Sequence, residues 1–389
     1  MKNKMKQKIK ILFVIENQEY GGGERSFEQI IRNINREKFE VYVACFNKGI
    51  FADKIKNYSQ IIHIDFSNRF NFRNIFYLKH IIVKNKIDIV HSQGARSSFF
   101  ASFAAKFAGV PVITTVAMLV EGFDVFILKK IFYIILNFIS ERLTDKFIVV
   151  SNELKRRLIK YHFIKPQNIE IIYNGIELND YIVDVDCSRN IRNSLGLEEN
   201  TILIGTVGRL VWQKGFEYFI DAIKILEEKL PNEKRERLKY LIVGEGKLKN
   251  KLINKVKKLG LQQKVIFTGF CTNVKEIISS LNVFILPSIL EGQPIVLLEA
   301  MALGKPIVAT DIPGVRESVV PENNVILVPS KNPHLLAYGI LKLLKEEEKA
   351  KKIGENAKQY VKERFDFSKI ILKYENFYEE IYRNIKKRN

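Results

Sequence analysis

The clearest pattern in the chain is Leu286-Pro-Ser-Ile-Leu-Glu-Gly-Gln-Pro-Ile-Val-Leu-Leu-Glu-Ala-Met-Ala-Leu-Gly-Lys-Pro306, which joins two short apolar runs at 282–286 and 306–309. Pro294 can open a helix here because its missing N–H would be unpaired at a helix start, and Gly304 can end that helix. The pattern predicts a strand, a helix from about Pro294 to Leu303, and a second strand. This order is typical of two parallel strands joined by a crossover helix.

The same alternation of an apolar run, a turn and a stretch of helical period continues outward along the whole chain. Many of the runs are hydrophobic on both faces, which favours parallel sheets covered by helices on both sides. The alternation restarts near Thr201, after an irregular polar stretch at 174–190. The sequence therefore predicts an α/β protein with two doubly wound domains that face each other across a cleft. Strands are expected at 9–15, 40–46, 60–64, 87–91, 111–116, 146–150, 169–172, 201–207, 239–243, 264–267, 282–286, 306–309 and 325–328.

Length and composition agree with two globular domains. A chain of 389 residues exceeds the roughly 250–300 residues over which a single core keeps growing. Hydrophobic residues make up 47% and charged residues 27%, which excludes a mainly disordered chain. The three cysteines, Cys45, Cys187 and Cys271, lie too far apart for a disulfide framework or a zinc site, so a reducing cytoplasm is expected.

The chain is strongly basic, with 63 Lys and Arg against 43 Asp and Glu and a net charge of +20. This excess favours anionic partners, but it does not choose between phosphorylated small molecules, anionic lipids and nucleic acid. Segment 126–139 is apolar almost all round and too short to span a bilayer. It predicts either a buried core helix or a helix in a membrane interface, with Lys129 and Lys130 toward lipid phosphates.

Segment 69–79 mixes basic and aromatic residues. It fits either a packed helix with Ile75, Phe76 and Leu78 in the core or an anion-binding surface on the acceptor side. We expect no nucleic-acid partner. Phe99, Phe100, Phe103 and Phe107 recur at helical spacing and are expected in the core.

Two glutamates flank the start of the helix predicted at 294–303. Glu291 precedes it and Glu299 lies beyond its first turn, so their backbones are up to roughly 12 Å apart. The free N–H groups of the helix start form a positive end that suits a phosphate. This arrangement predicts a nucleotide-sugar site, although two merely solvated carboxylates would give the same pattern. The donor contacts expected here are Gly292, Gln293, Pro294, Ile295 and Val296.

A second candidate element follows the strand predicted at 201–207. The loop Gly208-Arg-Leu-Val-Trp-Gln-Lys-Gly215 carries two cations, Arg209 and Lys214, at the carboxyl end of that strand. Two cations on one loop can neutralise a departing diphosphate, a role that metal ions often fill elsewhere. A pair of ordinary solvated cations is the alternative.

These motifs, in this order, resemble the family 4 retaining glycosyltransferases of GT-B fold. The resemblance rests on Gly208-Arg209 through Lys214-Gly215, followed by Glu291, seven residues, Glu299 and Ala300-Met-Ala. It extends over nearly the whole chain through the weaker matches Gly21-Gly-Gly-Glu-Arg-Ser26, Val149-Val-Ser151, Asn174-Gly-Ile-Glu177, Val243-Gly-Glu-Gly246 and Phe267-Thr-Gly269.

The resemblance implies transfer of a sugar from a nucleoside diphosphate sugar with retention of configuration and without a bound metal or other cofactor. Arg209 and Lys214 would hold the donor diphosphate, Glu291 would meet the sugar and Glu299 the ribose. It implies an acceptor-side domain at 1–178, a donor-binding domain at 179–366, and a C-terminal helix in 367–389 that packs back on the first domain. The further donor contacts would be Gly208, Gly244 and Gly269, and the acceptor-side residues Gly21, Gly22, Gly23, Glu24, His91 and Thr115.

The expected acceptor is a glycan or a glycan intermediate on a polyprenyl or other lipid anchor, used in cell-surface polysaccharide synthesis. The enzyme would then be cytoplasmic, at the inner face of the membrane, with a peripheral contact through 126–139. Family members often carry a His near position 117, where this chain has Ala117, so either Thr114, Thr115 or His91 takes over acceptor contacts or the acceptor differs. A satisfied structural His is the alternative for His91.

Two further motifs are read as coincidental. Gly21-x-Gly23-x-x-Ser26 nearly copies a dinucleotide-binding fingerprint, but its third position is Ser and no acid follows the second strand. Asp184-Val-Asp186 has the spacing of a metal-binding pair but falls in the polar linker. Two rival functions stay open: another GT-B enzyme, such as a nucleotide-sugar epimerase or a phosphorylase, and a non-enzymatic protein that binds anionic surfaces.

Overall fold

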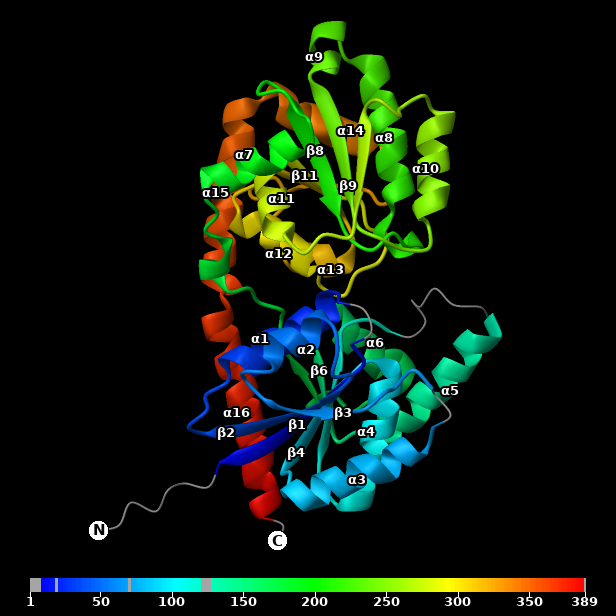
Figure 1. Cartoon of the computed structure of the whole chain (residues 1–389), viewed down its shortest axis with the longest axis vertical. Coiled ribbons are helices and arrows are strands. Elements are labelled where there is room, and N and C mark those ends of the chain that lie inside the picture. The colour runs from blue at the N-terminus through cyan, green and yellow to red at the C-terminus, as the bar shows by residue number, and fades with distance from the viewer. Residues whose placement is uncertain (1–7, 18–19, 69–70, 120–126, 388–389) are drawn as a thin grey trace, which may run out of the picture. The chain divides into compact units, whose positions relative to one another are not determined.

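The computed structural model describes residues 8–17, 20–68, 71–119 and 127–387, apart from the side chains of 127–130 and 132. The chain forms two compact units, residues 1–174 with 367–389 and residues 175–366 (Figure 1). The first crossing between the units lies at Asn174–Gly175, a few residues before the boundary expected after 178.

The first unit contains a seven-stranded parallel sheet. Its strand order is β3 (Gln60–His63), β2 (Phe39–Cys45), β1 (Ile9–Ile15), β4 (Ile89–Gln93), β5 (Val112–Val116), β6 (Lys146–Val149) and β7 (Ile169–Ile171). The order reverses direction between β1 and β4, as in a doubly wound fold. The helices of this unit are α1 (Gly22–Asn33), α2 (Ile50–Ile55), α3 (Arg73–Asn85), α4 (Ala95–Ala108), α5 (Ile127–Leu143), α6 (Asn152–His162) and α16 (Phe367–Lys386).

Strand β1 shows why helices cover both faces of this sheet. Successive residues of a strand point to opposite faces. Ile11 and Phe13 pack into a cluster with α1 and α16, whereas Leu12 and Val14 pack into a cluster with α3 and α4. All four side chains are completely buried. A strand whose residues are all apolar therefore packs against a hydrophobic core on each face of the sheet.

The second unit repeats this plan with six parallel strands. Their order is β10 (Val265–Gly269), β9 (Leu238–Val243), β8 (Ile202–Val207), β11 (Val283–Leu286), β12 (Ile307–Thr310) and β13 (Ile326–Val328). The order reverses between β8 and β11. The helices are α7 (Val185–Ser194), α8 (Phe216–Lys229), α9 (Asn232–Glu236), α10 (Lys249–Lys258), α11 (Val274–Ser280), α12 (Ile295–Ala302), α13 (Pro313–Arg316), α14 (Pro333–Lys345) and α15 (Glu347–Arg364).

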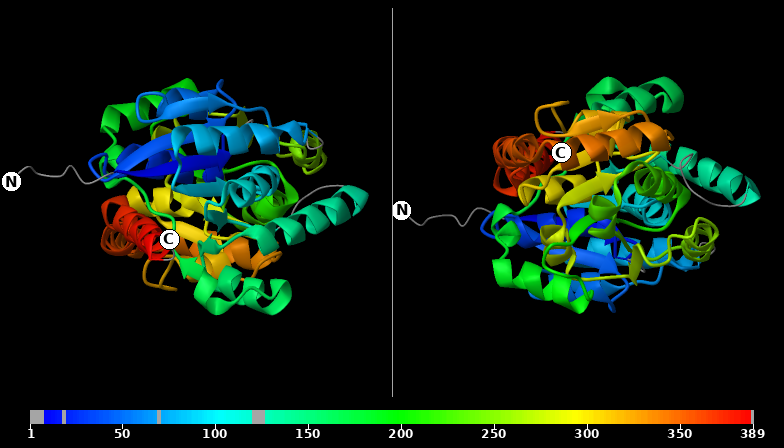
Figure 2. Two further views of the ribbon diagram at one scale, coloured as in Figure 1. Left: turned by 90° about the horizontal axis from the view of Figure 1, so that it is seen from below. Right: turned by 90° about the horizontal axis from the view of Figure 1, so that it is seen from above.

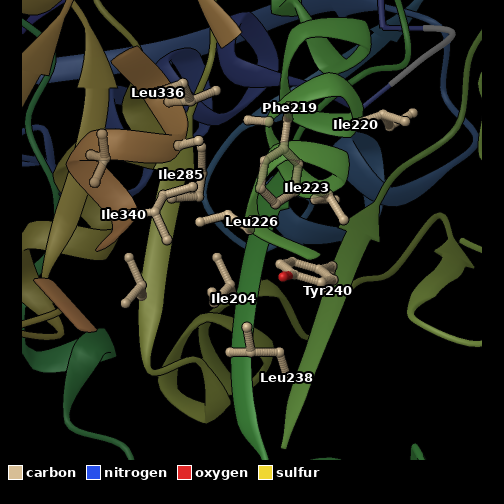
Figure 3. Close-up of a cluster of buried hydrophobic side chains, with 14 of the residues drawn as sticks. Ile204, Phe219, Ile220, Ile223, Leu226, Leu238, Tyr240, Ile285, Leu336 and Ile340 are labelled. Carbon is tan, nitrogen blue, oxygen red and sulfur yellow. The ribbon is translucent and has the colours of Figure 1, made fainter. Parts of the chain in front are cut away.

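One hydrophobic core of the second unit lies between the sheet and helices α8 and α14. Phe219 and Ile223 of α8 and Ile340 of α14 meet Ile204 of β8 and Tyr240 of β9 (Figure 3). The buried Tyr240 hydroxyl donates to the Glu227 carboxylate at 2.9 Å, so its polar end has a partner within the core. This packing fixes β8, whose carboxyl end carries the predicted donor loop.

The stretch at 174–190 is more regular than expected. It contains a short 3₁₀ helix, η3 (Leu178–Tyr181), and the first part of α7. Asp184 is the N-cap of α7, because its carboxylate accepts from the backbone N–H of Asp186 at 3.2 Å. The Asp184-x-Asp186 spacing is thus part of a helix cap.

Two aromatic residues lie on the surface: Phe107, which the helical spacing placed in the core, and Phe76, for which the core was one of two alternatives. Phe76 of α3 and Phe107 of α4 are exposed, whereas Ile75 and Leu78 are buried as expected. Helical spacing shows which residues share a face, but it does not show whether a neighbour covers that face.

Candidate donor and acceptor sites

Strands β8 and β11 are neighbours in the sheet, and the loops that leave their carboxyl ends are joined by backbone hydrogen bonds. Gly205 pairs with Phe284 in the strands. Beyond them, the carbonyl of Gln213 accepts from the N–H of Ile289 at 2.7 Å and from that of Leu290 at 3.2 Å. The strand order of the second sheet reverses between β8 and β11. Doubly wound sheets bind ligands at the carboxyl ends of the strands where such a reversal occurs.

These joined loops bring Lys214 and Glu291 into direct contact. The Lys214 ammonium donates to Oε1 of Glu291 at 2.6 Å, and the Ser288 hydroxyl donates to the same oxygen at 2.7 Å. The Glu291 side chain is only 6% exposed and that of Lys214 20%. From the sequence, Lys214 was expected to bind the diphosphate and Glu291 the sugar. The structure shows that these two side chains also form a salt bridge with each other. Ser288, which is completely buried, was not predicted.

Three of the predicted donor glycines are joined through their backbones. The N–H of Gly208 donates to the carbonyl of Val243 at 3.0 Å, and that of Gly244 donates to the carbonyl of Gly269 at 2.8 Å. Gly244 has a φ of +135°, and a Cβ there would lie 2.0 Å from the carbonyl oxygen of Gly208. Only glycine fits this close approach. Arg209, next to Gly208, has an exposed side chain.

Helix α12 follows directly, and its start differs slightly from the prediction. The helix begins at Ile295, and Pro294 is its N-cap with extended backbone angles, φ −76° and ψ 112°. Gly292 and Gln293 are buried and Val296 is half-buried. Gly304, with a φ of +64°, follows the helix end as expected. The positive end of the helix therefore lies beside the Lys214–Glu291 pair.

Glu299 of α12 points into the protein rather than into solvent. Its side chain is 3% exposed, and its Oε1 accepts from the Tyr181 hydroxyl at 2.7 Å. Tyr181 is the last residue of η3 and was not predicted to be near the site. The alternative of a merely solvated carboxylate does not hold for Glu299.

In the first unit, the loop Gly21–Gly23 forms the start of α1. Gly21 is the N-cap, and its N–H donates to the carboxylate of Glu24 at 2.8 Å, so Glu24 caps its own helix. A Cβ on Gly23 would lie 2.5 Å from Nε2 of Gln93, at the end of β4, whereas Gly22 is exposed. This loop and the end of β4 thus meet where the strand order of the first sheet reverses.

His91 and Thr115 lie in the core of the first unit rather than on its surface. His91 is completely buried, with Nδ1 2.8 Å from the hydroxyl of Tyr378 and Nε2 2.7 Å from that of Thr115. Burial lowers the pKa of His91 to about 3, which keeps the imidazole neutral. Both ring nitrogens are satisfied inside the protein. The structure therefore supports the structural alternative for His91 and corrects its assignment, and that of Thr115, to the acceptor surface.

Helix α5 covers most of the segment predicted at 126–139. Residue 126 and the side chains of Lys129 and Lys130 lie outside the described residues. Within the described part of the chain, no helix is both long and apolar enough to cross a bilayer.

Two family models match the chain in succession: Glycosyltransferase Family 4 over residues 20–180 and Glycosyl transferases group 1 over residues 188–360. Among curated proteins, an α-1,3-galactosyltransferase of Escherichia coli that acts on GlcNAc-diphosphoundecaprenol is 28% identical over 79% of this chain and 80% of its own length. An uncharacterized glycosyltransferase of Methanocaldococcus jannaschii is 30% identical over 80% of this chain and 82% of its own.

Solved structures show the same architecture. HepE from Anabaena, in complex with UDP and glucose, superimposes with a TM-score of 0.82 at 21% identity, over 96% of this chain and all of that one. WaaG, a glycosyltransferase involved in lipopolysaccharide biosynthesis, gives a TM-score of 0.74 at 19% identity, over 94% of this chain and 98% of that one. With its paired parallel-sheet units, its Lys214–Glu291 contact and these relatives, the chain belongs to the group 1, family 4 glycosyltransferases and has the GT-B fold.

Proposed function

We propose that this glycosyltransferase moves a sugar, with retention of configuration, from a nucleoside diphosphate sugar to a hydroxyl of a lipid-linked glycan. The names of two relatives support this substrate class: the galactosyltransferase above, and a Campylobacter jejuni N-acetylgalactosaminyltransferase whose acceptor is a sugar-diphospho-undecaprenol. The HepE complex makes uridine diphosphate the first donor nucleotide to test. Such acceptors belong to cell-surface polysaccharide synthesis and would place the enzyme peripherally on the inner face of the membrane.

One observation carries the donor half of the proposal: Lys214 and Glu291 touch beside the start of α12, while Glu299 is buried farther along the same helix. An ammonium has three donors. Lys214 can therefore keep its bond to Glu291 and still donate to a phosphate oxygen. The free N–H groups at the start of α12 add partial positive charge. Together with Arg209, these groups stabilise the charge that develops on the leaving diphosphate.

The two glutamates are proposed to bind the hydroxyl groups at either end of the donor. Glu291 would accept from the transferred sugar and Glu299 from the ribose. The cations of this site take the part that a divalent metal has in many other nucleotide-dependent enzymes, so we propose that transfer needs no metal ion.

The transfer assay combines UDP-galactose, UDP-glucose or UDP-N-acetylglucosamine with a synthetic sugar-diphospho-polyprenol, and the product is analysed by NMR. An axial glycosidic bond, formed from the axially linked donor, would support retention, and an equatorial one would contradict it. Glu291→Gln should lower the rate by at least about a hundredfold. Glu228→Gln, at an exposed glutamate of α8 that pairs with Lys224, is the matched control and should keep full activity. Conversion of the donor sugar without acceptor would instead indicate an epimerase.

A further inference from the structure

The carboxyl ends of β1 and β4 carry an ion pair. Glu16 directly follows β1, and Arg96 lies in the first turn of α4, three residues beyond the end of β4. The Nε–H of Arg96 donates to Oε2 of Glu16 at 2.8 Å, and a second guanidinium nitrogen contacts the other carboxylate oxygen. The two side chains are only 22% and 21% exposed. The pair joins the two strands between which the strand order of the first sheet reverses, and doubly wound sheets bind ligands at such a reversal.

The donor site of the second unit has the same plan. Lys214 and Glu291 form an ion pair beyond β8 and β11, the two strands at the reversal of the second sheet. In each unit a helix follows the second strand of the pair, α4 after β4 and α12 after β11. The first turns of these helices contain no acid, and their N-cap residues, Gly94 and Pro294, have no side-chain oxygen. The positive end of each helix therefore suits an anionic ligand.

The start of α4 offers donors from the backbone and from Arg96. Helix α4 packs between α3 and α5 (Figures 1 and 2). The N–H groups of residues 95–97 precede its first internal hydrogen bond, so they have no partner within the helix. Of the five N–H donors of Arg96, two contact Glu16 and one donates to the carbonyl of Ser67 at 3.0 Å. Two donors of the guanidinium are left for a ligand.

Gln93, the last residue of β4, has a buried amide that the protein itself does not satisfy. Its side chain is 7% exposed, and its Oε1 has no hydrogen-bond partner among the described residues. Its Nε2 points to the start of α1, 2.5 Å from the position that a Cβ on Gly23 would take. A buried polar group without a partner is costly and rare. An amide can both donate and accept, as a sugar hydroxyl can, so a bound sugar would supply the missing bond.

We propose that this edge of the first sheet binds the sugar-diphosphate head group of the acceptor, an inference that rests on the proposed function. Arg96 and the start of α4 bind the diphosphate, because a guanidinium fork and free backbone N–H groups both match phosphate oxygens. Gln93 bonds to a hydroxyl of the acceptor sugar. Glu16 holds the plane of the guanidinium and does not touch the acceptor. An uncharged glycan would leave both the cation and the helix start without a matching group.

The test compares two acceptors in the transfer assay described above: the synthetic sugar-diphospho-polyprenol, and a polyprenyl glycoside of the same sugar without the diphosphate. The wild type should have a KM for the diphosphate acceptor at least about tenfold lower than for the glycoside. Arg96→Gln should raise the KM for the diphosphate acceptor by about tenfold or more and change that for the glycoside by less than about twofold. Its affinity for UDP should stay at the wild-type value.

Three further variants complete the set. Arg96→Lys keeps a charge without the fork, so its KM should fall between those of wild type and Arg96→Gln. Gln93→Met keeps the side-chain length and should raise the KM for both acceptors alike, by about five- to tenfold. Arg383→Gln is the control: Arg383 lies near the end of α16, one turn beyond Glu379, which pairs with Lys38 at the opposite edge of the sheet. It should keep every wild-type constant, and thermal melts compare the folding of all variants.

Equal use of the two acceptors by the wild type would overturn the inference, as would an unchanged KM for the diphosphate acceptor in Arg96→Gln. An equal loss of UDP affinity and acceptor affinity in that variant would assign Arg96 to the donor and would also overturn it. If the wild type transfers sugar to neither acceptor, the proposed function itself is wrong, so the two failures are distinguishable.

A second, independent observation concerns Tyr181. Its hydroxyl donates to Oε1 of Glu299 at 2.7 Å, and Glu299 is almost completely buried. The segment that carries Tyr181 is itself fixed, because the N–H of Ile176 donates to the carbonyl of Phe365 at 2.9 Å. A buried carboxylate needs hydrogen-bond donors to offset its lost hydration. A donor held in place also fixes the orientation of that carboxylate.

We infer that Tyr181 is a positioning residue that orients Glu299 toward the ribose of the donor, an inference that rests on the proposed donor site. Tyr181 acts through Glu299 and binds no part of the sugar. Its removal should weaken ribose recognition and leave the later chemical step unchanged.

Calorimetric titration of UDP and of 2′,3′-dideoxy-UDP against wild type and Tyr181→Phe tests this role. The variant should bind UDP about five- to tenfold more weakly, the size of one lost hydrogen bond to a charged group. Its affinity for the dideoxy nucleotide should change by less than about twofold, because that ligand lacks the hydroxyls that Glu299 binds. In transfer assays the KM for the donor should rise while kcat stays nearly constant.

Tyr360→Phe, which removes an exposed phenol bonded to Arg364, is the control and should bind both nucleotides normally. Equal weakening for both nucleotides would show that Tyr181 only supports packing, and unchanged UDP affinity would also overturn the inference. If the wild type binds neither nucleotide, the proposed donor site itself is wrong, which separates that failure from the failure of Tyr181 alone.

Discussion

At the scale of single residues, Ser288 is the group that fixes Glu291 in the absence of substrate. Its hydroxyl shares Oε1 of Glu291 with Lys214, and its own carbonyl accepts from the hydroxyls of Thr310 and Ser330. Ser288 is thus linked both to the loop that carries Glu291 and to the next strand, β12. A carboxylate held in this way is oriented before the sugar arrives, which lowers the cost of binding the transition state.

The first prediction concerns Ser288→Ala. The change removes one of the two donors to Oε1 of Glu291 and should lower kcat by about tenfold, with a loss of about 1–2 kcal/mol in the free energy of unfolding. Steady-state kinetics and urea unfolding measure the two effects. Ser288→Thr keeps the hydroxyl, so it should recover more activity than Ala. Wild-type kcat in Ser288→Ala would show that Glu291 needs no such support.

The second prediction concerns pH and the buried His91. Its pKa of about 3 in the folded chain lies below the 6.5 of an unfolded chain, so the unfolded state binds the extra proton. Stability from this group is therefore complete above pH 6.5 and declines as the pH falls toward 3, by up to about 1.4 kcal/mol per pH unit. Urea unfolding at several pH values should show a shallower acid dependence for His91→Gln than for wild type. Parallel curves would contradict this prediction.

The glutamates and the cation loop could be predicted from the sequence, whereas Ser288 and Tyr181 could not. The pair Glu291 and Glu299 and the pair Arg209 and Lys214 are recognisable because each pair lies within a single strand–loop–helix segment. The Tyr181–Glu299 contact joins segments 118 positions apart, and no local pattern encodes it. His91 was expected at the end of a strand, but it lies within β4, and its burial depends on α16, which comes from the far end of the chain.

At the scale of helices and strands, the short helix α13 packs closely against the backbone of the loop that carries Glu291. A Cβ on Gly314 of α13 would lie 2.4 Å from the carbonyl oxygen of Glu291 and 2.5 Å from that of Gly292. Backbone cannot be displaced as easily as a flexible side chain. The loop can therefore keep its present path only while residue 314 has no side chain.

The third prediction follows from this contact. Gly314→Ala should shift the loop and lower transfer by about tenfold or more, with a stability loss of about 1–3 kcal/mol from overpacking. Gly260→Ala is the control, because Gly260 has a φ of +69° but open space around it. It should lose about 1 kcal/mol of stability through backbone strain and keep full activity. Full activity in Gly314→Ala would show that the loop tolerates displacement.

The strands were the most predictable elements. All thirteen expected strands form, most of them because a strand buried on both faces of a parallel sheet leaves a continuous apolar run. Helix α7 was missed because its polar sequence resembles a linker, although Asp184 gives the N-cap signal. The exposure of Phe76 was also unpredictable, since amphipathic spacing alone does not distinguish a core face from a docking face.

At the scale of the whole molecule, the residues proposed to bind the donor all belong to one of the two units. The Lys214–Glu291 pair, Glu299 and Tyr181 all belong to residues 175–366. The Gly21–Gly23 loop belongs to the other unit. The restart of the strand pattern near Thr201 predicted this division, and the family resemblance implied that the chain returns to the first unit at 367.

The fourth prediction uses this division. Amide hydrogen exchange should show that UDP protects 208–215 and 287–299 by about tenfold or more, while the strands of the first unit change little, because a ligand stabilises the state it binds. EDTA in the buffer should leave this protection unchanged, as expected for cations supplied by the protein. Protection that is lost with EDTA would show that a metal ion holds the diphosphate.

The most direct test of the donor site is calorimetric titration of UDP into wild type, Lys214→Ala and Lys251→Ala. Both lysines pair with a glutamate in the second unit, but Lys251 lies on the exposed surface of α10. The donor site described here predicts saturable binding to the wild type, binding at least about tenfold weaker in Lys214→Ala, and wild-type affinity in Lys251→Ala. Equal affinity in all three proteins, or no binding of UDP or any other nucleoside diphosphate to the wild type, would contradict it.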